Sequence, residues 1–324
     1  MAEIDLSLEE LQEKRANRFR ILVCVDGSEE SYRGLRYAGD IGKHPDSDII
    51  LLYVRPIDQG MRTGGLQVRV ARENMLNWGL DLPGIKYLKM GLDRLIENGQ
   101  IAEDWSSEFT HTDVDGDPLG DNKTVYTSPR NGRSVVLKLK VAPSVAVGIL
   151  DQYELGPYNM IILGSSNKSG GIAKNFWDPA VAEKVAVHAP CSVCIARDLE
   201  VGHGQLFCTD GSDRAMDMLL KAGETSKRVG ANVSVLSVAL DQDGEAQAKA
   251  NVEKAVQHLK SIDIEPVSAF TRIGNPVQEI IEAGKDYSFI VMGDTGRTGL
   301  KRFFMGSVAF KVMEYAQNSV MIIR

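Results

Sequence analysis

The sequence of 324 residues has no apolar run long enough to span a membrane, only four cysteines, and no dense cluster of basic residues. Four cysteines are too few for a disulfide framework in a chain of this length. A formal net charge of −7, without clustered lysine and arginine, argues against nucleic acid or an anionic membrane as the main partner. The first residues do not resemble a signal peptide, so we expect a cytoplasmic protein.

The patterns that mark catalytic or metal centres are also absent. The five histidines show neither i, i+4 pairing nor a neighbouring cysteine or carboxylate pattern. There is no Walker A sequence, no G-x-G-x-x-G after a strand and no nucleophile elbow. Cys191 and Cys194 form a C-x-x-C within an apolar β-like run, where their spacing sends the thiols to opposite faces. We therefore expect neither an efficient enzyme nor a redox or metal role for this cysteine pair.

What the chain does contain is an internal repeat. RILVCVDGS near the start and GQLFCTDGS in the second half are both apolar runs that end in Asp-Gly-Ser, which places Asp26 and Asp210 184 residues apart. The next apolar runs end at Val54 and Val238 and keep this offset. Matched elements at a constant spacing indicate two copies of one domain.

We assign the copies to residues 19–198 and 203–324. They follow a helical extension over 1–18, in which Ser7 and Glu10 are spaced as a capping box.

Apolar runs typical of buried strands alternate with amphipathic segments in both copies. The first copy has predicted strands at 20–26, 48–54, 135–142, 158–164 and 191–197, and the second at 205–210, 232–240, 265–274, 287–293 and 318–324. The second copy has predicted helices at 212–229, 245–262, 276–286 and 307–317. The pattern predicts an α/β chain with two tandem doubly wound, Rossmann-like or flavodoxin-like domains. Each is expected to have a parallel five-stranded sheet in the order 3-2-1-4-5.

The first copy is longer because of an insertion near 100–134, whose glycine, proline and acidic clusters predict a solvated hairpin or a long loop. Asp113, Asp115 and Asp117 resemble the start of a calcium loop. However, Pro118 stands where that loop needs glycine, and Thr124 where it needs glutamate. We therefore expect an acidic turn.

The last strand of each copy, 191–197 and 318–324, would be an exposed edge if it were left alone. We expect the two copies to pack through these strands as an internal pseudo-dimer.

The strongest chemical signal is the loop GDTGRTGLKRFFMGSV at 293–308. Gly293 ends a predicted strand, Gly296 follows, and Gly306 with Ser307 opens a helix. Glycines allow close approach and unusual dihedrals, and free N–H groups at a helix start can bind phosphate. Ser307 can add a hydroxyl or can cap its own helix. Glycine-rich turns are also common simply as connections between a strand and a helix. Spacing alone therefore leaves open both phosphate binding and a purely structural turn. The same applies to the basic side chains in the loop, which can neutralise a triphosphate or be solvated charges: Arg297, Lys301 and Arg302.

With the pattern G-2x-G-9x-G-[S/T] and an Asp that ends the first strand, the sequence resembles the universal stress protein family. The resemblance implies that Asp210 and Val238 contact adenosine, that the turn at Gly274 lies beside the nucleotide, and that the glycine loop with Ser307 holds the phosphates. The residues implied to bind the cofactor are Asp210, Val238, Gly274, Gly293, Gly296, Arg297, Gly306 and Ser307.

The first copy keeps Asp26 and Gly164 but departs from the rest of the pattern. Asn167 stands in place of Gly296, and the position of Gly306 is taken by Trp177 or Pro179, depending on the alignment. Asp178 would occupy the helix start and repel phosphate. We expect one ATP per chain, bound only in the second copy.

The favoured function is a nucleotide-binding regulatory protein that acts in a stress response through unidentified protein partners, with ATP (or AMP or ADP) as ligand and Mg²⁺ possible beside ATP. The alternatives are a slow ATP-hydrolysing or nucleotide-transferring enzyme, and a structural stress protein that binds no nucleotide. The sequence has a nucleotide-binding pattern but no general base, which favours the regulatory protein over these alternatives.

Overall fold

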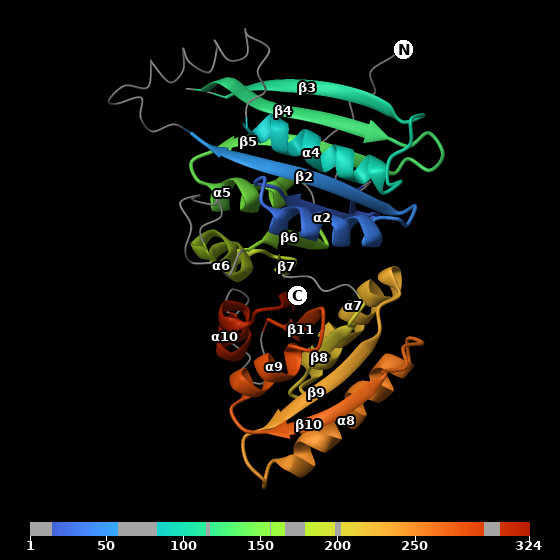
Figure 1. Cartoon of the computed structure of the whole chain (residues 1–324), viewed down its shortest axis with the longest axis vertical. Helices are drawn as coiled ribbons and strands as arrows, with labels where there is room; N and C mark the ends of the chain where they lie inside the picture. Colours follow the sequence, from blue (N-terminus) through green and yellow to red (C-terminus); the bar gives the residue numbers. More distant parts are fainter. Residues whose placement is uncertain are drawn as a thin grey trace, which may run out of the picture. The chain divides into compact units, whose positions relative to one another are not determined.

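The computed structural model describes residues 15–57, 83–114, 117–155, 157–165, 179–197, 202–294 and 305–324 (Figure 1). The chain divides into two compact units. Described residues up to Ile162, with 179–181, belong to the first unit, and residues 163–165 with those from Ala182 onwards belong to the second. The division passes through β6 (Met160–Gly164) and α6 (Pro179–His188), so the last strand of the first repeat, β7 (Ser192–Ala196), clusters with the second unit.

In the second unit, the second repeat forms five strands in the order β10-β9-β8-β11-β12, all paired in parallel. They are β8 (Gln205–Cys208), β9 (Val233–Ala239), β10 (Ser268–Ile273), β11 (Phe289–Gly293) and β12 (Ser319–Ile323). Numbered within the repeat, this is the order 3-2-1-4-5, which confirms the prediction for this copy. β7 adds an antiparallel strand beside β12, with Cys194 opposite Met321.

The sheet of the first unit differs in strand count from the prediction. β1 (Phe19–Cys24), β2 (Ser47–Pro56) and β5 (Ser134–Ala142) pair in parallel as expected, with β6 next to β1. The insertion forms the hairpin β3 (Ser106–Val114) and β4 (Asp117–Thr127), and β4 extends the sheet by pairing antiparallel with β5. Because β3 is exposed along almost its whole length, its sequence lacks the apolar pattern of a buried strand.

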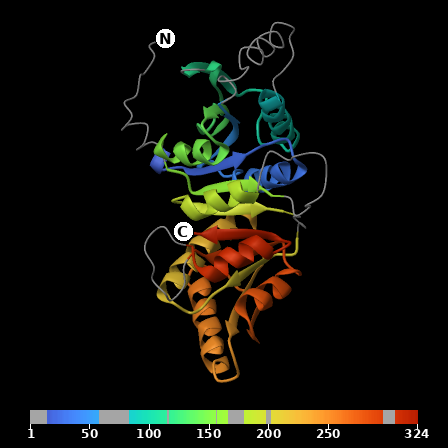
Figure 2. The same ribbon diagram turned by 90° about the vertical axis from the view of Figure 1, so that its left-hand side faces the viewer.

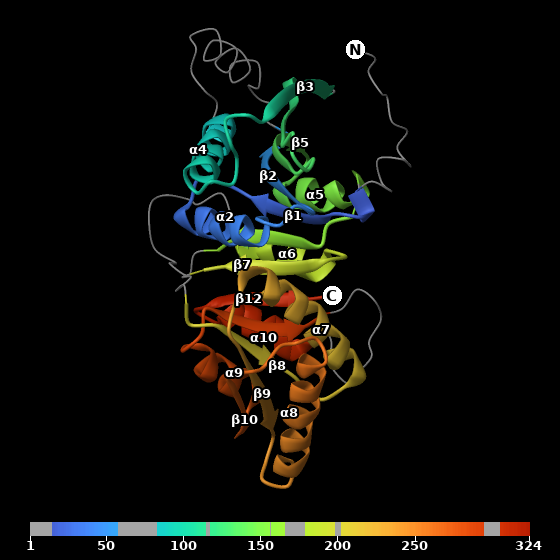
Figure 3. The ribbon, with the colours of Figure 1, turned by 90° about the vertical axis from the view of Figure 1, so that its right-hand side faces the viewer.

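Helices cover both faces of each sheet. In the first unit, α2 (Glu29–Ile41) and α4 (Pro83–Glu97) lie on one face, and α5 (Val145–Leu150), followed by the 3₁₀ turn η2 (Asp151–Leu155), lies on the other (Figure 2). In the second unit, α7 (Asp213–Val229) and α8 (Glu245–Lys260) lie on one side of the sheet and α9 (Pro276–Gly284) on the other (Figure 3). α10 (Ser307–Tyr315) packs against α9.

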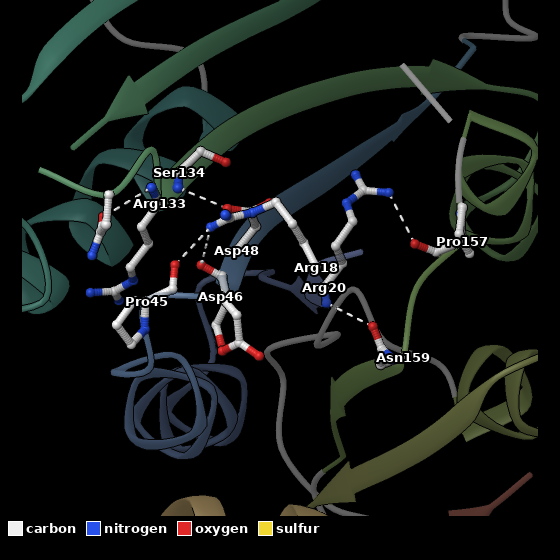
Figure 4. Close-up of polar contacts among 11 residues, drawn as sticks. Arg18, Arg20, Pro45, Asp46, Asp48, Arg133, Ser134, Pro157 and Asn159 are labelled. Carbon is white, nitrogen blue, oxygen red and sulfur yellow. Dashed lines mark hydrogen bonds and ion pairs between the residues drawn. The ribbon is translucent and has the colours of Figure 1, made fainter. Parts of the chain in front are cut away.

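Asp48, at the start of β2, ties neighbouring strands together at the amino edge of the first sheet (Figure 4). Its Oδ2 accepts a hydrogen bond from Arg18 Nε at 2.6 Å, and its Oδ1 accepts one from the backbone N–H of Ser134 at 2.8 Å. The backbone N–H of Arg20 donates to Asn159 Oδ1 at 2.8 Å, which links β1 to the segment before β6. These bonds hold the parallel strands at the edge opposite their carboxyl ends.

Two arginines at the ends of β7 and β12 bind helix ends in a reciprocal way. Arg197 donates to the carbonyl oxygens of Met313 and Ala316 at the end of α10. Arg324 donates to the carbonyl oxygen of Ala186 in the last turn of α6. A guanidinium in this position satisfies carbonyls that the helix leaves unpaired and opposes the negative end of its dipole. Each of the two strands therefore stabilises the final helix of the other repeat.

The strand starts follow the same reciprocal pattern. Ser319 Oγ accepts from the backbone N–H of Arg197 at 2.9 Å, and Ser192 Oγ accepts from that of Arg324 at 3.4 Å. The pairing of β7 with β12 is therefore supported by matched contacts at both ends of the ladder.

Replacing Arg197 with methionine is expected to destabilise the second unit by about 2–4 kcal/mol, because carbonyl oxygens at the end of α10 lose a buried charged donor. Burial lowers the pKa of Arg197 to about 10, so the side chain is still charged at neutral pH. Hydrogen exchange should become faster in the α10 amides. Lys311→Met, which removes an exposed cation from the same helix, is the control and should change little. Unchanged α10 exchange in the Arg197 variant would contradict the capping role.

Candidate functional site

The predicted site residues gather at the carboxyl edge of the second repeat's parallel strands. Asp210 follows β8, Val238 lies near the end of β9, Gly274 follows β10, and Gly293 ends β11. The chain winds outward in opposite directions from β8 and β11, which are neighbours in the sheet. This is the topological switch point at which ligands bind in open α/β sheets. The fold therefore brings together residues that are distant in sequence.

The turn from β8 to α7 is held by its own side chains and by α8. Asp210 Oδ1 accepts from the backbone N–H of Ser212 at 3.0 Å, and Ser212 caps α7 by accepting from Ala215 N–H at 3.2 Å. Asn251 of α8, which is buried, donates from Nδ2 to the Asp210 carbonyl oxygen at 3.0 Å. At Gly211, with φ of +79°, a Cβ would lie 2.0 Å from Asn251 Oδ1. Only glycine fits there, and Asp210 is held firmly at the sheet edge.

Asp294 joins the strand before the glycine loop to the helix after it. Its backbone N–H donates to the Ile323 carbonyl oxygen at 3.1 Å, and its own carbonyl oxygen accepts from Gly306 N–H at 2.5 Å. Its buried carboxylate lies 3.1 Å from Arg214 Nη2 and 3.4 Å from Arg324 Nε. One residue thus fixes the two ends of the loop and pairs with two cations.

Gly306 and Ser307 differ from the sequence expectation in two details. Gly306 has φ of −60° and ψ of 145°, which any residue adopts, so an unusual dihedral does not explain the glycine. Gly306, and not Ser307, is the N-cap of α10, so the self-capping interpretation of Ser307 is wrong. Ser307 occupies the first helical position with an exposed side chain.

The start of α10 is suited to an anion. Its N-cap residue, Gly306, has no side chain to accept from the first N–H groups, and the first turn carries no acidic residue. By contrast, α7 and α9 are capped by Ser212 and Asn275. Open N–H groups together with the positive end of the helix dipole favour a bound negative charge.

Several predicted residues lie outside the described residues. In the second copy these are Gly296, Arg297, Lys301 and Arg302, and in the first copy Asn167, Trp177 and Asp178. Most of the predicted N-terminal helix also falls there.

The corresponding turn of the first repeat has the same backbone plan but different surroundings. Asp26 Oδ1 accepts from the backbone N–H two residues further on at 2.9 Å, as Asp210 does. A Cβ at Gly27 would lie 2.5 Å from the ring of Tyr87, in the place that Asn251 takes beside Gly211. Tyr87 also packs on Tyr53, with ring centroids 5.9 Å apart. Burial raises the pKa of Asp26 above its usual range.

The acidic segment of the insertion does not assemble a metal site in the described part. Asp117 is buried in a bidentate pair with Arg55, at 2.5 and 2.6 Å, while Asp113 is exposed and Asp115 lies outside the described residues. Within the described ranges, no group of three or more histidine, cysteine or acidic side chains could hold a metal ion. Cys191 and Cys194 are buried, and burial raises the pKa of both thiols.

No helix in the described segments is both long and apolar enough to cross a bilayer.

Three residues at this edge were not predicted from the sequence: Arg214, Asn251 and Asp294. A signal for Asn251 exists, because it is a polar residue on the apolar stripe of α8. Arg214 could have been noticed because the offset of 184 aligns it with an acid, Glu30. Asp294 lies inside the glycine pattern, at a position that the pattern leaves open.

Known proteins resemble this chain in sequence. The chain matches the Universal stress protein family over residues 17–74 and 206–324. It is 31% identical over 133 residues to a universal stress protein of Methanocaldococcus jannaschii, a match that covers 36% of this chain and 78% of that relative.

Solved structures show the same fold over nearly the whole chain. A universal stress protein from Archaeoglobus fulgidus has a TM-score of 0.57 at 19% identity, covering 94% of this chain and 96% of that one. A protein of unknown function from Pseudomonas aeruginosa has a TM-score of 0.54 at 16% identity, covering 96% and 94%. Because the family match includes segments of both repeats and more than half of the residues, this chain belongs to the universal stress protein family.

Proposed function

We propose that this chain is an ATP-binding regulatory protein of the cytoplasm, with one nucleotide site in the second repeat and an output carried by nucleotide-dependent contacts with protein partners. The observation that carries the proposal is the convergence of Asp210, the ends of β9 and β11, and the uncapped start of α10 at one sheet edge. Family membership supports it, because the described residues of the pattern by which the sequence resembles this family meet there.

The residues present suit an adenine nucleotide. Asp210 and Val238 would contact the adenosine part, with Gly274 beside it. The start of α10 after Gly306, with the Ser307 hydroxyl, would bind phosphate at the edge where Gly293 ends β11, and Gly296 and Arg297 complete the pattern in sequence. The start of α10, whose N-cap residue has no side chain and whose first turn has no acid, suits an anionic group. ATP can carry Mg²⁺ into the site, and AMP or ADP would occupy the same edge.

The first repeat is proposed to bind no nucleotide. Its turn packs the aromatic pair Tyr53 and Tyr87 where the second repeat has Ser237 and Asn251, and its Asp26 is desolvated. The first turn of α2 also carries two acidic residues, which already interact favourably with the positive end of its helix dipole.

One ATP per chain is therefore expected in isothermal titration. Gly306→Val should weaken binding at least about a hundredfold, because a branched side chain blocks several backbone donors at once. Gly244→Val, at the N-cap glycine of α8, is the matched control and should bind normally. Two equivalent sites would show that the first repeat also binds nucleotide. Normal binding by the Gly306 variant would show that the second repeat does not carry the site.

The protein is further proposed not to be an efficient enzyme, because the carboxylates at the described edge are already engaged, Asp210 by the Ser212 N–H and Asp294 by two arginines. We expect ATP turnover well below about 1 per second in purified protein. Steady release of phosphate at or above that rate, lost in the Gly306→Val variant, would instead support the enzyme interpretation.

The two repeats are proposed to pair through their last strands as an internal pseudo-dimer. The antiparallel ladder between β7 and β12 and the reciprocal bonds of Arg197 and Arg324 support this arrangement.

A further inference from the structure

The first turns of the equivalent helices α2 and α7 differ in charge at one position. Ser28 and Ser212 are their N-caps, with the same hydrogen bond to the backbone three residues on. Two residues after the cap, the first repeat has Glu30 and the second has Arg214. The two copies therefore present opposite charges at the same place on the carboxyl edge of their sheets.

Arg214 is locally unfavourable for its own helix. The amino end of a helix carries partial positive charge, so a cation in the first turn is destabilising and an acid such as Glu30 is stabilising. Such a departure from local preference is expected where a residue serves a function, provided that its surroundings compensate for it.

The compensation comes from Asp294. Its carboxylate lies 3.1 Å from Arg214 Nη2, across the switch point from β8 to the end of β11. The same carboxylate faces Arg324 Nε at 3.4 Å, so these three groups together carry a net positive charge. The Arg214 side chain is 42% exposed, whereas that of Asp294 is 9% exposed. The acid is thus enclosed, and the guanidinium stays open to the edge where the loop begins.

The first repeat lacks this arrangement. Ser165 takes the place of Asp294, because its backbone N–H donates to the Ala196 carbonyl oxygen at 2.9 Å just as that of Asp294 donates to Ile323. A serine cannot hold a cation by charge, and the equivalent of Arg214 is an acid. The pair of Arg214 and Asp294 is therefore specific to the repeat with the intact glycine loop.

We propose that Arg214, held by Asp294, binds the phosphate chain of the nucleotide and makes the second site selective for phosphorylated over unphosphorylated adenosine. This rests on the proposed nucleotide site and adds to it a side chain from outside the glycine pattern. A guanidinium suits the role because it can donate to Asp294 and to a phosphate oxygen at the same time.

The test is titration of adenosine, AMP, ADP and ATP into the full chain and into Arg214→Gln, Arg214→Lys and Arg214→Glu variants. We expect Arg214→Gln to weaken ATP binding about tenfold or more, Arg214→Glu to weaken it further, and Arg214→Lys to retain part of the affinity. Adenosine affinity should stay within about twofold in all variants, because no phosphate is present. Raising salt from about 0.05 M to about 0.5 M should weaken ATP binding less in Arg214→Gln than in the unmodified chain.

Lys227→Gln is the matched control, since it removes one positive charge from the other end of α7 and should leave all four affinities unchanged. An equal loss for adenosine and ATP in Arg214→Gln would assign Arg214 a structural role and overturn the proposal, as would unchanged ATP affinity. Failure of the nucleotide site itself would be seen in the unmodified chain, as absence of binding for all four ligands, and is thereby distinguishable from failure of the Arg214 assignment.

Discussion

The carboxyl edge of the second repeat's sheet depends on the position of Asp294. Its backbone is hydrogen-bonded to the end of β12 and to Gly306, the N-cap of α10. Its carboxylate forms ion pairs with Arg214 and Arg324. Burying a carboxylate is costly unless it is paired and hydrogen-bonded, so this acid and its two arginines constrain one another's positions. Through Arg324, which also donates to the end of α6, the start of the glycine loop is physically connected to the strand ladder of β7 and β12. Contacts at the sheet edge and in the ladder therefore share one side chain.

The two repeats show how one backbone plan can support different sites. Both place an Asp-Gly-Ser turn after the central strand, and both require glycine because an α-helix packs directly on it. The packing residue is an asparagine in the second repeat and a tyrosine in the first. The asparagine donates to the carbonyl oxygen of Asp210, whereas the tyrosine ring packs on Gly27, beside an Asp26 carboxylate whose pKa is raised by burial. The difference lies in the side chains that surround the turn and not in the turn itself.

The insertion extends the first sheet but is not part of the backbone plan that the two repeats share. Its hairpin attaches to β5, the outer parallel strand, and Arg55 of β2 reaches Asp117 in a bidentate buried pair. The pair anchors the start of β4, which explains why one aspartate of the calcium-like segment is buried while another is exposed. An outer strand is the place where a sheet can accept additional strands without disturbing its centre.

The sequence by itself determined the repeat, the alternation of strands and helices, the order 3-2-1-4-5 in the second copy and the residues of the glycine pattern. These follow from hydrophobic periodicity and turn chemistry, which are local and visible in a single chain. Only the tertiary structure decided that β3 and β4 join the first sheet, because an exposed strand is defined by backbone pairing and not by burial. It also decided the contacts of Arg214, Asn251 and Asp294, since each has a partner at least 41 residues away. The dihedrals of Gly306 and the position of Ser307 likewise depend on where α10 begins, which Asp294 sets by accepting the Gly306 N–H across the loop.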